Sequence, residues 1–590
     1  MSKLGPVGID FGTTKTAFAY YDDQKEKQII SFPTTVLFAD EQERHWESVV
    51  IGKGDGDNPI RTWKNFKPYL GNENTEWQQV PPRCHPERLP KGIEAPSTIQ
   101  LTALVLREIK RRYCEIKREN ERWDIGPTTI TTPAFSTFKQ RQALIFAAKL
   151  AGFDDISLVE EPVAAYLMHH FKKASETDSG NMNSLVIDFG GGTLDLALIA
   201  SKERSAPEVL GTYTVKRGTG SPAKDIGGND IEDAIIDLWK ANEGFLSRLP
   251  QQGAMPSSLS ADMIAAARFA KEKHNPKPGD CNPPRTFQEV SADPLSSEVN
   301  VEMRGQDYLK GNYRFRHGVE LEFPPLERGA FFNILDDPNF KLNFKENLDI
   351  GINHLLAEQH LTRQDVGQII LVGGSCYIRR VLQDVRNSFT DGSGTLKANI
   401  LFEEPEFAIA YGALNYKSGS KVFNPAIRNK LSMSIYIEVE FDPKKDTNWL
   451  QRGFLANSKF IRHENRHYIE LARRGLLVEQ VNGVLTIPFP IKSRKQQYLK
   501  IYQVKPSIDK QDYKNIRHDH FVEEIPIPIR SYLITFLYWM DQLGNFYRSA
   551  KPTIRFVIPK SWRSLDKEHD WDNQASIEKY RQIYFQEVSK

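Results

Sequence analysis

Alternating apolar positions mark two similar strand-turn-strand segments in this chain. One runs from Val7 through a Gly/Thr turn to Tyr20, and the other runs from Leu185 through a Gly-rich turn to Ile199. The same tetrapeptide, Ile-Asp-Phe-Gly, stands at 9–12 and at 187–190, so each turn follows a buried strand that ends in an aspartate. The pattern predicts a duplicated hairpin.

Helical and extended patterns alternate around these hairpins. Apolar residues at helical spacing predict helices over 99–117 and 138–151, and 128–132 is typical of a strand that a proline ends. Such alternation indicates an α/β domain. The segment 275–326, rich in proline and charge, predicts an irregular or mixed subdomain.

The pattern changes after residue 417, where a loop and a tether over 418–429 predict a domain boundary. Turn signals at Asn482-Gly483 and Gly544-Asn545 separate several alternating runs and favour an antiparallel β-sandwich. A short helix is expected over 576–588. The alternating runs are 431–439, 484–489, 498–504, 532–540 and 553–558.

Length and composition place the chain among ordinary globular proteins. A chain of 590 residues, 39% hydrophobic and 26% charged, exceeds one core and predicts two to four domains. No apolar run reaches the roughly eighteen residues of a membrane span, and the first residues lack a signal-peptide core. We therefore expect a cytoplasmic protein with no membrane contact. Four cysteines, at 84, 114, 281 and 376, lack metal-binding spacing and are expected to be reduced thiols.

The net charge of +2 conceals an asymmetry. Residues 430–590 carry 27 Lys and Arg against 19 Asp and Glu, a net of +8, whereas residues 1–429 carry 51 against 57, a net of −6. The two parts are therefore different modules. Without a reader motif or interleaved aromatics, the basic surplus is more typical of a solvated surface than of a nucleic-acid site.

The two Gly/Thr turns point to phosphate chemistry. Glycine lets backbone N–H groups approach a polyphosphate closely, and threonine hydroxyls add donors. Mg²⁺ keeps several waters and needs one or two carboxylates, so Asp10 and Asp188 predict a magnesium site that binds through water. The alternative is an ordinary strand-turn pair whose glycines only satisfy positive φ angles.

The motifs together resemble the seventy-kilodalton heat-shock chaperones of the DnaK type, within the actin-like ATPase superfamily. Six blocks occur in the family's order: 8–14, 132–166, 188–195, 227–230, 371–375 and 404–413. The resemblance implies an actin-like, ribonuclease-H-like duplicated α/β ATPase domain over 1–417, with lobes of about 1–185 and 186–417. A linker over 418–429, a substrate-binding-like sandwich over 430–562 and a short helical tail over 563–590 would follow.

The resemblance also implies roles for particular residues. Lys67 would neutralise charge near the γ-phosphate, with Lys64 as a rival, and Glu161 would orient or deprotonate the attacking water. Pro133 and Arg141 resemble the family's relay pair. The alternative for Lys67 is a solvated surface lysine. For the relay pair, the alternative is a helix-start proline at 133 and a surface arginine at 141. The implied catalytic set is Asp10, Lys67, Glu161, Asp188 and Thr193. The implied nucleotide-binding set is Gly12, Thr13, Thr14, Lys15, Gly190, Gly191, Gly192, Gly227, Gly228, Arg268, Lys271, Gly373, Gly374, Ser375, Tyr377 and Glu406.

Several positions depart from the family pattern. Arg268 stands where the family has Glu, Asn275 where Ser is usual, and Tyr377 where an arginine commonly stacks on adenine; an aromatic ring at 377 can still stack. Ser157 replaces a basic residue of the surface for a J-domain cochaperone, and 418–429 lacks the family's acidic, leucine-rich linker. The short tail predicts that a helical lid is absent or vestigial.

The resemblance implies an ATP-dependent chaperone of the stress-response type with ATP/ADP and Mg²⁺ as cofactors. Its partner would be an unfolded or extended polypeptide client. The family resemblance adds a J-domain cochaperone and a nucleotide-exchange factor as possible further partners. The client would bind the sandwich by main-chain pairing and through an apolar pocket. The alternative is that the sandwich is a generic docking domain. Two rival functions remain open. One is a scaffold that binds ATP without hydrolysis and holds a dedicated partner through the basic sandwich; the other is a small-molecule kinase.

Overall fold

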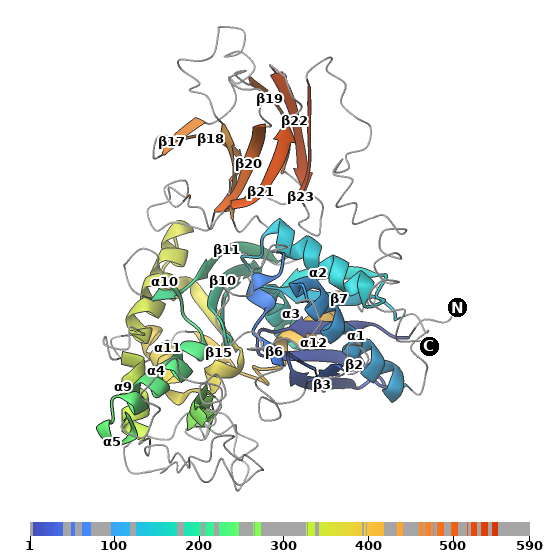
Figure 1. Ribbon diagram of the computed structural model, residues 1–590. Coiled ribbons are helices and arrows are strands. Elements are labelled where there is room, and N and C mark those ends of the chain that lie inside the picture. The colour runs from blue at the N-terminus through green and yellow to red at the C-terminus, as the bar shows by residue number, and fades with distance from the viewer. Residues whose placement is uncertain are drawn as a thin grey trace.

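Figure 1 shows the computed structural model, with a lower body of helices packed on two mixed sheets and, above it, two antiparallel sheets. The structure describes residues 4–38, 49–52, 62–71, 96–117, 125–173, 182–201, 207–217, 224–246, 263–264, 266–268, 270–272, 326, 328–336, 342–391, 395–396, 398–417, 433–439, 460–463, 466–473, 476, 481–488, 497–504, 516, 521–527, 533–540 and 546–552.

The first sheet carries the first hairpin. Strands β1, β2 and β3 run antiparallel, and β7 and β8 run parallel to β1, in the order β3-β2-β1-β7-β8. Helices α1 and α2 begin with capping boxes, Ser97 with Gln100 and Thr137 with Gln140, which satisfy amides that have no partner inside the helix. The bounds are β1 Val7–Phe11, β2 Lys15–Tyr21, β3 Lys27–Pro33, β7 Thr128–Thr132, β8 Ile156–Glu160, α1 Thr98–Ile116 and α2 Phe138–Leu150.

The second sheet repeats this arrangement. Strands β9, β10 and β11 run antiparallel, and β14 and β15 run parallel to β9, in the order β11-β10-β9-β14-β15. In both sheets the predicted hairpin provides the central strand and its antiparallel neighbour. The bounds are β9 Met182–Phe189, β10 Leu194–Ser201, β11 Glu208–Thr214, β14 Val366–Val372 and β15 Asn399–Leu401. The predicted hairpins, helices over 99–117 and 138–151, and strand over 128–132 are confirmed within one to three residues at their ends.

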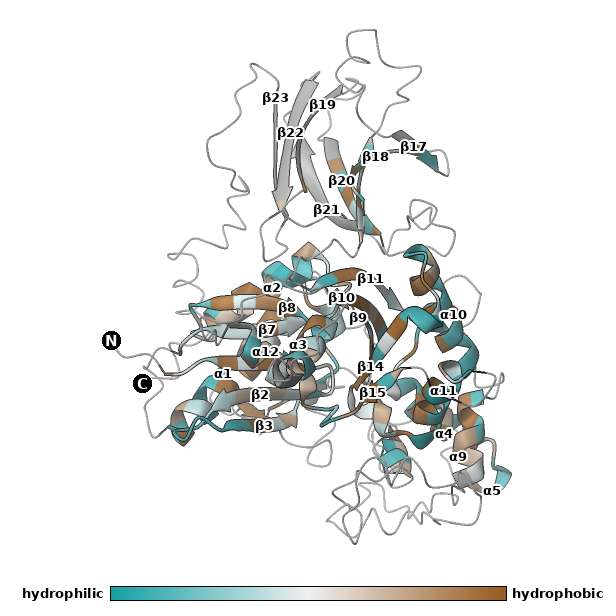
Figure 2. Cartoon of the chain, turned by 180° about the vertical axis from the view of Figure 1, so that it is seen from behind, coloured by the Kyte–Doolittle hydropathy of each residue, from teal (hydrophilic) through white to brown (hydrophobic). Residues whose placement is uncertain are grey.

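Two crossing helices join the sheets. Helix α3 (Glu161–Lys173) contacts β9, β10 and β14, and α12 (Ala408–Lys417) contacts β1, β2 and β7 as well as α3. One buried cluster contains side chains of both sheets and of both helices. The backbones approach closely, because a Cβ at Gly412 would lie 1.7 Å from the carbonyl oxygen of Ala164. Figure 2 shows the apolar strands β9, β10 and β14 inside the body and polar helix faces outside.

Smaller elements complete the first half of the body. The sheet β5-β4-β6 leads into the 3₁₀ turn η3, which begins at Lys67. In the second half, α4 follows the paired strands β12 and β13. The bounds are β4 Thr35–Phe38, β5 Val49–Ile51, β6 Thr62–Lys64, η3 Lys67–Tyr69, β12 Lys216–Arg217, β13 Lys224–Asp225, α4 Gly228–Lys240, α5 Glu243–Leu246 and α9 Arg328–Asp336.

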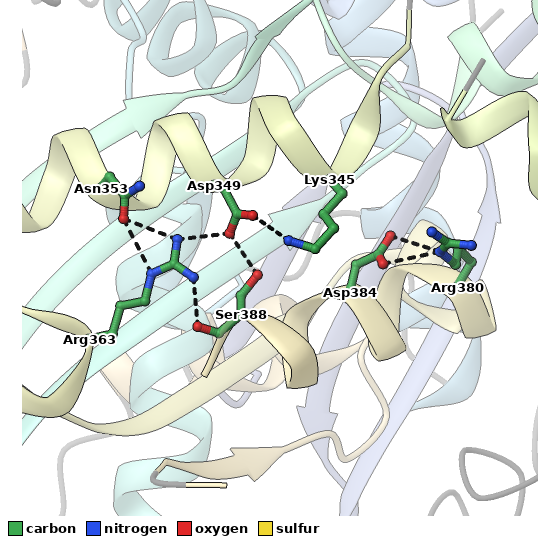
Figure 3. Close-up of polar contacts among 7 residues, drawn as sticks. All are labelled: Lys345, Asp349, Asn353, Arg363, Arg380, Asp384 and Ser388. Atoms are coloured by element: carbon green, nitrogen blue, oxygen red, sulfur yellow. Dashed lines mark hydrogen bonds and ion pairs between the residues drawn. The ribbon is translucent and has the colours of Figure 1, made fainter. Parts of the chain in front are cut away.

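A polar network fixes α11 (Arg379–Ser388) beside α10 (Phe344–Glu358) (Figure 3). Asp349 of α10 accepts from Arg363 Nη2 at 2.8 Å and from Ser388 Oγ at 2.7 Å, and Arg363 Nη1 donates to the Ser388 carbonyl at 2.6 Å. Burial opposes the charge of Asp349, but hydrogen bonds from Lys345, Ser388 and Arg363 outweigh it and lower the pKa of Asp349. The turn Gly374–Tyr377 directly precedes α11 in the chain.

The upper unit consists of two antiparallel sheets, with orders β17-β18-β16-β20-β21 and β19-β22-β23. Strands β21 and β23 of the two sheets contact each other, and the side chains of Ile435, Ile437, Ile469 and Ile501 are fully buried. This unit is called the C-terminal sandwich below. Its strands are β16 Ser434–Val439, β17 Phe460–His463, β18 Arg466–Ala472, β19 Asn482–Pro488, β20 Gln497–Val504, β21 Phe521–Ile527, β22 Leu533–Met540 and β23 Phe546–Pro552.

One turn prediction in this unit is wrong. Asn482 and Gly483 lie within β19 and pair with Trp539 and Tyr538 of β22, so the ladder overrides the local turn preference. The runs at 431–439, 484–489, 498–504 and 532–540 correspond to β16, β19, β20 and β22. Predictions for 418–429, most of 275–326, 544–545, 553–558 and 576–588 fall outside the described residues.

The prediction of reduced cysteine thiols agrees with the two cysteines that the structure describes. Cys114 and Cys376 are buried and not joined in a disulfide, while positions 84 and 281 fall outside the described residues. Among the helices that the structure describes, none is long and apolar enough to cross a membrane.

The C-terminal sandwich touches the body at the N-terminus of α2, which faces it in Figures 1 and 2. The backbone N–H of Phe138 donates to Gln503 Oε1 of β20 at 3.0 Å. This amide is one of the first four of the helix, which have no partner inside it, so Gln503 acts as an external cap. Beside it, Met433 packs with Ala134 and Phe135 in a separate buried cluster.

The helix crossing gives a direct test of the fold. Gly412→Ala introduces a Cβ where the Ala164 backbone already lies, so it should lower the free energy of unfolding by about 2–3 kcal/mol. Gly329→Ala, in α9 with nothing within 4 Å of its Cβ position, is the matched control and should be neutral or stabilising. Urea unfolding measures both variants. Equal stability of the two variants would contradict the tight crossing.

Candidate functional site

A cavity of about 880 Å³ lies between the two mixed sheets of the body, lined by the turns that follow β1, β9 and β14. The three segments meet because β1 and β9 are the central strands of their sheets and β14 is the parallel neighbour of β9. Most of the predicted site residues line this cavity: Asp10, Gly12, Thr13, Thr14, Lys15, Lys67, Glu161, Asp188, Gly190, Gly191, Gly192, Thr193, Arg268, Lys271, Gly373, Gly374, Ser375, Tyr377 and Glu406.

The two glycine turns face each other across the cavity. A Cβ at Gly191 would lie 2.8 Å from Thr14 Cγ2, and a Cβ at Gly192 would lie 3.6 Å from Thr13 Oγ1. At Gly12 a Cβ would lie 2.2 Å from the Lys15 carbonyl oxygen, so only glycine fits this tight turn. The first turn therefore packs its threonines against the glycines of the second.

Gly227 and Gly228 do not line the cavity but support its wall. The N–H of Gly228 donates to the Gly190 carbonyl at 2.9 Å, and the N–H of Asn229 donates to the Gly191 carbonyl at 2.8 Å. A Cβ at Gly227 would lie 2.4 Å from the carbonyl carbon of Gly192. The two residues thus fix the second glycine turn from behind, at the start of α4.

Asp10 and Asp188 are the next-to-last residues of β1 and β9, the central strands of the two sheets, and line the cavity. Burial and the nearby Glu161 carboxylate raise the pKa of Asp10 to about 7. Burial, Glu161 and Asp195 raise the pKa of Asp188 well above its ordinary value. Several acids are therefore held together with too little positive charge around them.

Lys67 and Glu161 form a buried ion pair in the same cavity. Lys67 Nζ lies 2.5 Å from Glu161 Oε1, and each side chain is 10% exposed. Burial disfavours the ammonium, but the carboxylates of Glu161 and Asp10 outweigh it and raise the pKa of Lys67. Lys67 thus stays charged among the acids. Its rival Lys64 is buried in β6 and does not line the cavity.

Asp195 holds the threonine of the second turn. Its carboxylate accepts from Thr193 Oγ1 at 2.8 Å and from Thr214 Oγ1 at 2.5 Å, and burial raises its pKa to about 6. Asp195 belonged to the second motif but had no assigned role. Its signal in the sequence is its place two residues after Thr193, at the start of β10.

A second ion cluster lies on another wall. Glu232 of α4 accepts from Lys271 at 2.7 Å and from Arg268 Nε at 3.1 Å. Burial opposes its charge, yet Lys271 and Arg268 lower the pKa of Glu232 to about 2. The sequence reasoning missed Glu232, although it stands four residues after Gly228 and thus one helical turn into α4.

The turn that follows β14 presents Tyr377 to the cavity. Tyr377 packs edge-to-face on Phe402, with centroids 5.4 Å apart. Gly373 has a φ of 89°, and a Cβ there would lie 2.4 Å from the Phe189 carbonyl oxygen, so glycine is required at this position. A flat aromatic surface is thus fixed at the edge of the site.

The remaining predicted residues are placed as follows. Pro133 lines the cavity, whereas Arg141 lies behind it and pairs with Glu160 at 2.6 Å, next to Glu161 in the chain. Thr131, missed from the sequence, donates to Asp10 Oδ1 at 3.4 Å. Ser157 is buried in β8.

The donor set fits a hydrated divalent cation. In the described part of the chain, no three His, Cys, Asp or Glu side chains gather as a direct metal cage. A Mg²⁺ held by two carboxylates, waters and phosphate oxygens does not need one. Burial and the nearby Glu161 carboxylate raise the pKa of Asp10 and of Asp188, and a cation bound there would favour their charged forms.

The comparisons with known proteins agree with this geometry. Residues 6–244 match the family model described as Hsp70 protein. The chain is 25% identical over 434 residues to a ribosome-associated molecular chaperone of Eremothecium gossypii, covering 69% of this chain and 60% of that protein. It is 26% identical over 415 residues to the chaperone protein dnaK of Cyanidioschyzon merolae, covering 65% and 57%. It is 27% identical over 428 residues to the chaperone protein DnaK 3 of a Synechococcus species, covering 69% of this chain and 56% of that protein.

The chain is thus similar to the Hsp70 family over residues 6–244 and, at 25–27% identity, to chaperones named for that family. The chain spans about 56–60% of the length of the curated relatives it matches. Members of the family are ATPases that bind nucleotide and Mg²⁺, and the relatives named here are molecular chaperones.

The Glu232 cluster predicts a pH-dependent contribution to stability. Because the folded pKa lies below the ordinary value of 4.5, the cluster stabilises the protein above that pH and loses its effect as the pH falls toward 2. Glu232→Gln should lower the free energy of unfolding by about 3 kcal/mol at pH 7, since it leaves two cations without their acid. The difference in the free energy of unfolding between Glu232→Gln and the wild type should narrow below pH 4.5. Urea unfolding across the range from neutral pH to about pH 3.5 checks this, and a constant gap would contradict it.

Proposed function

We propose that this protein is an ATP-hydrolysing chaperone of the heat-shock type, which couples its nucleotide cycle to binding of unfolded or extended polypeptide. The observation that carries the ATPase part is the buried Lys67–Glu161 pair, set beside Asp10 and Asp188 in a cavity walled by two facing glycine turns. Lys67, Glu161, Asp10, Asp188 and Thr193 are the proposed catalytic residues.

We further propose that the body is the duplicated, actin-like domain. Support comes from its two sheets, which share one strand order and one pattern of parallel and antiparallel neighbours. In each copy the hairpin turn approaches the cavity, and the two crossing helices fill the space between the sheets. Such a duplication would place one phosphate turn on either side of a nucleotide.

Mg²⁺, held through water by Asp10 and Asp188, would neutralise phosphate charge and align the γ-phosphate for attack. The backbone N–H groups around Gly12 and Gly190 to Gly192, with the hydroxyls of Thr13 and Thr14, would bind the phosphate oxygens. Arg268, Lys271, Ser375 and Tyr377 would line the adenosine end. There, Glu232 would fix the two cations and Tyr377 would offer an aromatic face.

The residues around the phosphate position have chemically distinct tasks. Glu161 Oε1 already accepts from Lys67, so Oε2 is the oxygen that would accept a proton from the attacking water. Lys67 would remain protonated and stabilise the negative charge of the transition state. Asp195 would hold Thr193 in place through its hydroxyl.

The chaperone part rests on the C-terminal sandwich and on the names of the relatives, which are chaperones. A β-sandwich can add an extended peptide by main-chain pairing, with pockets for side chains. Coupling would pass through α2. Gln503 of the sandwich caps its first amide, and Arg141, one turn further on, pairs with Glu160 beside Glu161.

The ATPase proposal predicts the effect of two substitutions. Lys67→Ala and Glu161→Ala should each slow single-turnover hydrolysis by about 10²–10³-fold, because each removes a group that acts on the reacting atoms. Lys117→Ala removes a lysine that pairs with Asp23 outside the cavity and is the matched control. Tight ATP binding without hydrolysis by the wild type would favour the nucleotide-binding scaffold instead.

The coupling proposal predicts a separate effect at the contact between body and sandwich. Gln503→Leu leaves the Phe138 amide without its cap, so stimulation of hydrolysis by an unfolded apolar peptide should fall at least about threefold. Basal hydrolysis should stay within about twofold, because Gln503 lies outside the cavity. Tyr502→Phe removes a hydroxyl on the same strand that bonds Glu438 and serves as the control. Unchanged stimulation in Gln503→Leu would rule out this route.

A further inference from the structure

An ion pair between Lys15 and Glu406 connects two walls of the cavity. Lys15 is the first residue of β2, directly after the Gly12-Thr13-Thr14 turn, and its Nζ lies 3.1 Å from Glu406 Oε2. Glu406 precedes α12 by two residues, so the two partners are far apart in the chain. Both side chains line the cavity.

The two partners differ in how far their side chains are exposed. The side chain of Glu406 is 14% exposed, and its segment is fixed by hydrogen bonds from Gly373 N to the Pro405 carbonyl and from Ala408 N to the Glu404 carbonyl. The side chain of Lys15 is 41% exposed, and its Nζ lies 5.0 Å from the centre of the Phe407 ring. Glu406 and Phe407 thus form a fixed docking point for the more exposed Lys15 side chain.

Lys15 differs from the other cations that line the cavity. The side chains of Lys67, Lys271 and Arg268 are 10%, 13% and 30% exposed, and each pairs with a nearly buried acid. Lys15 is more exposed than any of them, yet its positive charge still lowers the pKa of Asp10, as a lesser influence than burial, Glu161, Lys67 and Thr131. Its charge therefore acts at the phosphate end of the cavity.

We propose that Glu406 competes with nucleotide phosphate for the Lys15 ammonium group, so that this ion pair sets the affinity for phosphorylated nucleotides. The inference rests on the proposed nucleotide binding in this cavity. Phosphate oxygens held by the Gly12-Thr13-Thr14 turn would lie next to the start of β2 and attract the same charge. Each bound nucleotide must then draw Lys15 away from Glu406, and each release returns it.

The competition for Lys15 predicts different changes in affinity for phosphorylated and unphosphorylated ligands. ADP and ATP carry the phosphates that Lys15 would bind, whereas adenosine does not. Glu406→Gln removes the competing charge and keeps the shape, so it should tighten MgADP and MgATP binding by roughly two- to tenfold. Lys15→Met should weaken both by a similar factor. Adenosine affinity should change in neither variant.

A double variant distinguishes competition for Lys15 from simple repulsion between Glu406 and phosphate. If Glu406 acts through Lys15, Glu406→Gln has no effect in the Lys15→Met background. If it repels phosphate directly, the tightening persists there and the proposal is overturned. Asp23→Asn removes one negative charge from an ion pair outside the cavity and controls for net charge.

The experiment is isothermal titration of the full chain with MgATP, MgADP and adenosine, with thermal unfolding of each variant as a check on folding. Wild-type protein that binds neither MgATP nor MgADP would refute the proposed function itself. Wild-type protein that binds both, with Glu406→Gln unchanged or weaker for MgADP, would refute only the competition. Tightening in Glu406→Gln that is confined to the phosphorylated ligands and vanishes with Lys15→Met supports it.

Discussion

The crossing of α3 and α12 is the constraint on which the site depends. Gly412 lets the helices approach until the Ala164 carbonyl leaves no room for a Cβ, and Gly8 lets α12 lie against β1, where a Cβ would be 2.1 Å from the Leu414 amide. The crossing fills the space between the two sheets with one shared core. Both helices start at the cavity, so the same contact that joins the two sheets also places Glu161 and Glu406 in it.

The site that results is electrostatically unfavourable by itself. Asp10, Glu161, Asp188 and Asp195 lie together with Lys67 as their main cation, and the pKa values of the three aspartates are raised. Such an arrangement costs stability, because buried acids are kept near one another. In the proposed function, Mg²⁺ would relieve this repulsion by supplying positive charge, and the glycine turns would supply donors for the phosphates that come with it. The loss of stability and the proposed function thus both arise from the same group of buried acidic side chains.

Local patterns were sufficient to predict the hairpins, the first helices and most of the sandwich strands, because each depends on periodicity and caps within a few residues. They also predicted that Asp10 and Asp188 share one site, whereas Lys67, which lines the same cavity, was expected only from the family resemblance. Glu232 was missed because its role depends on Arg268 and Lys271, more than thirty positions away in the chain. The turn at Asn482-Gly483 was wrong because pairing with β22, a long-range contact, decides its conformation. The cap from Gln503 to α2 joins residues that are 365 positions apart, and no local signal reveals it.

The central claim is that two aspartate-bearing hairpins, one from each lobe, form a single Mg²⁺-nucleotide site. Hydrogen exchange measured by mass spectrometry, with and without MgATP, tests it most directly. The account predicts slower exchange in peptides that cover 9–15 and 187–194 at the same nucleotide concentration, with both effects lost in EDTA. Protection of one hairpin alone, or of neither while ATP binds elsewhere, would contradict it.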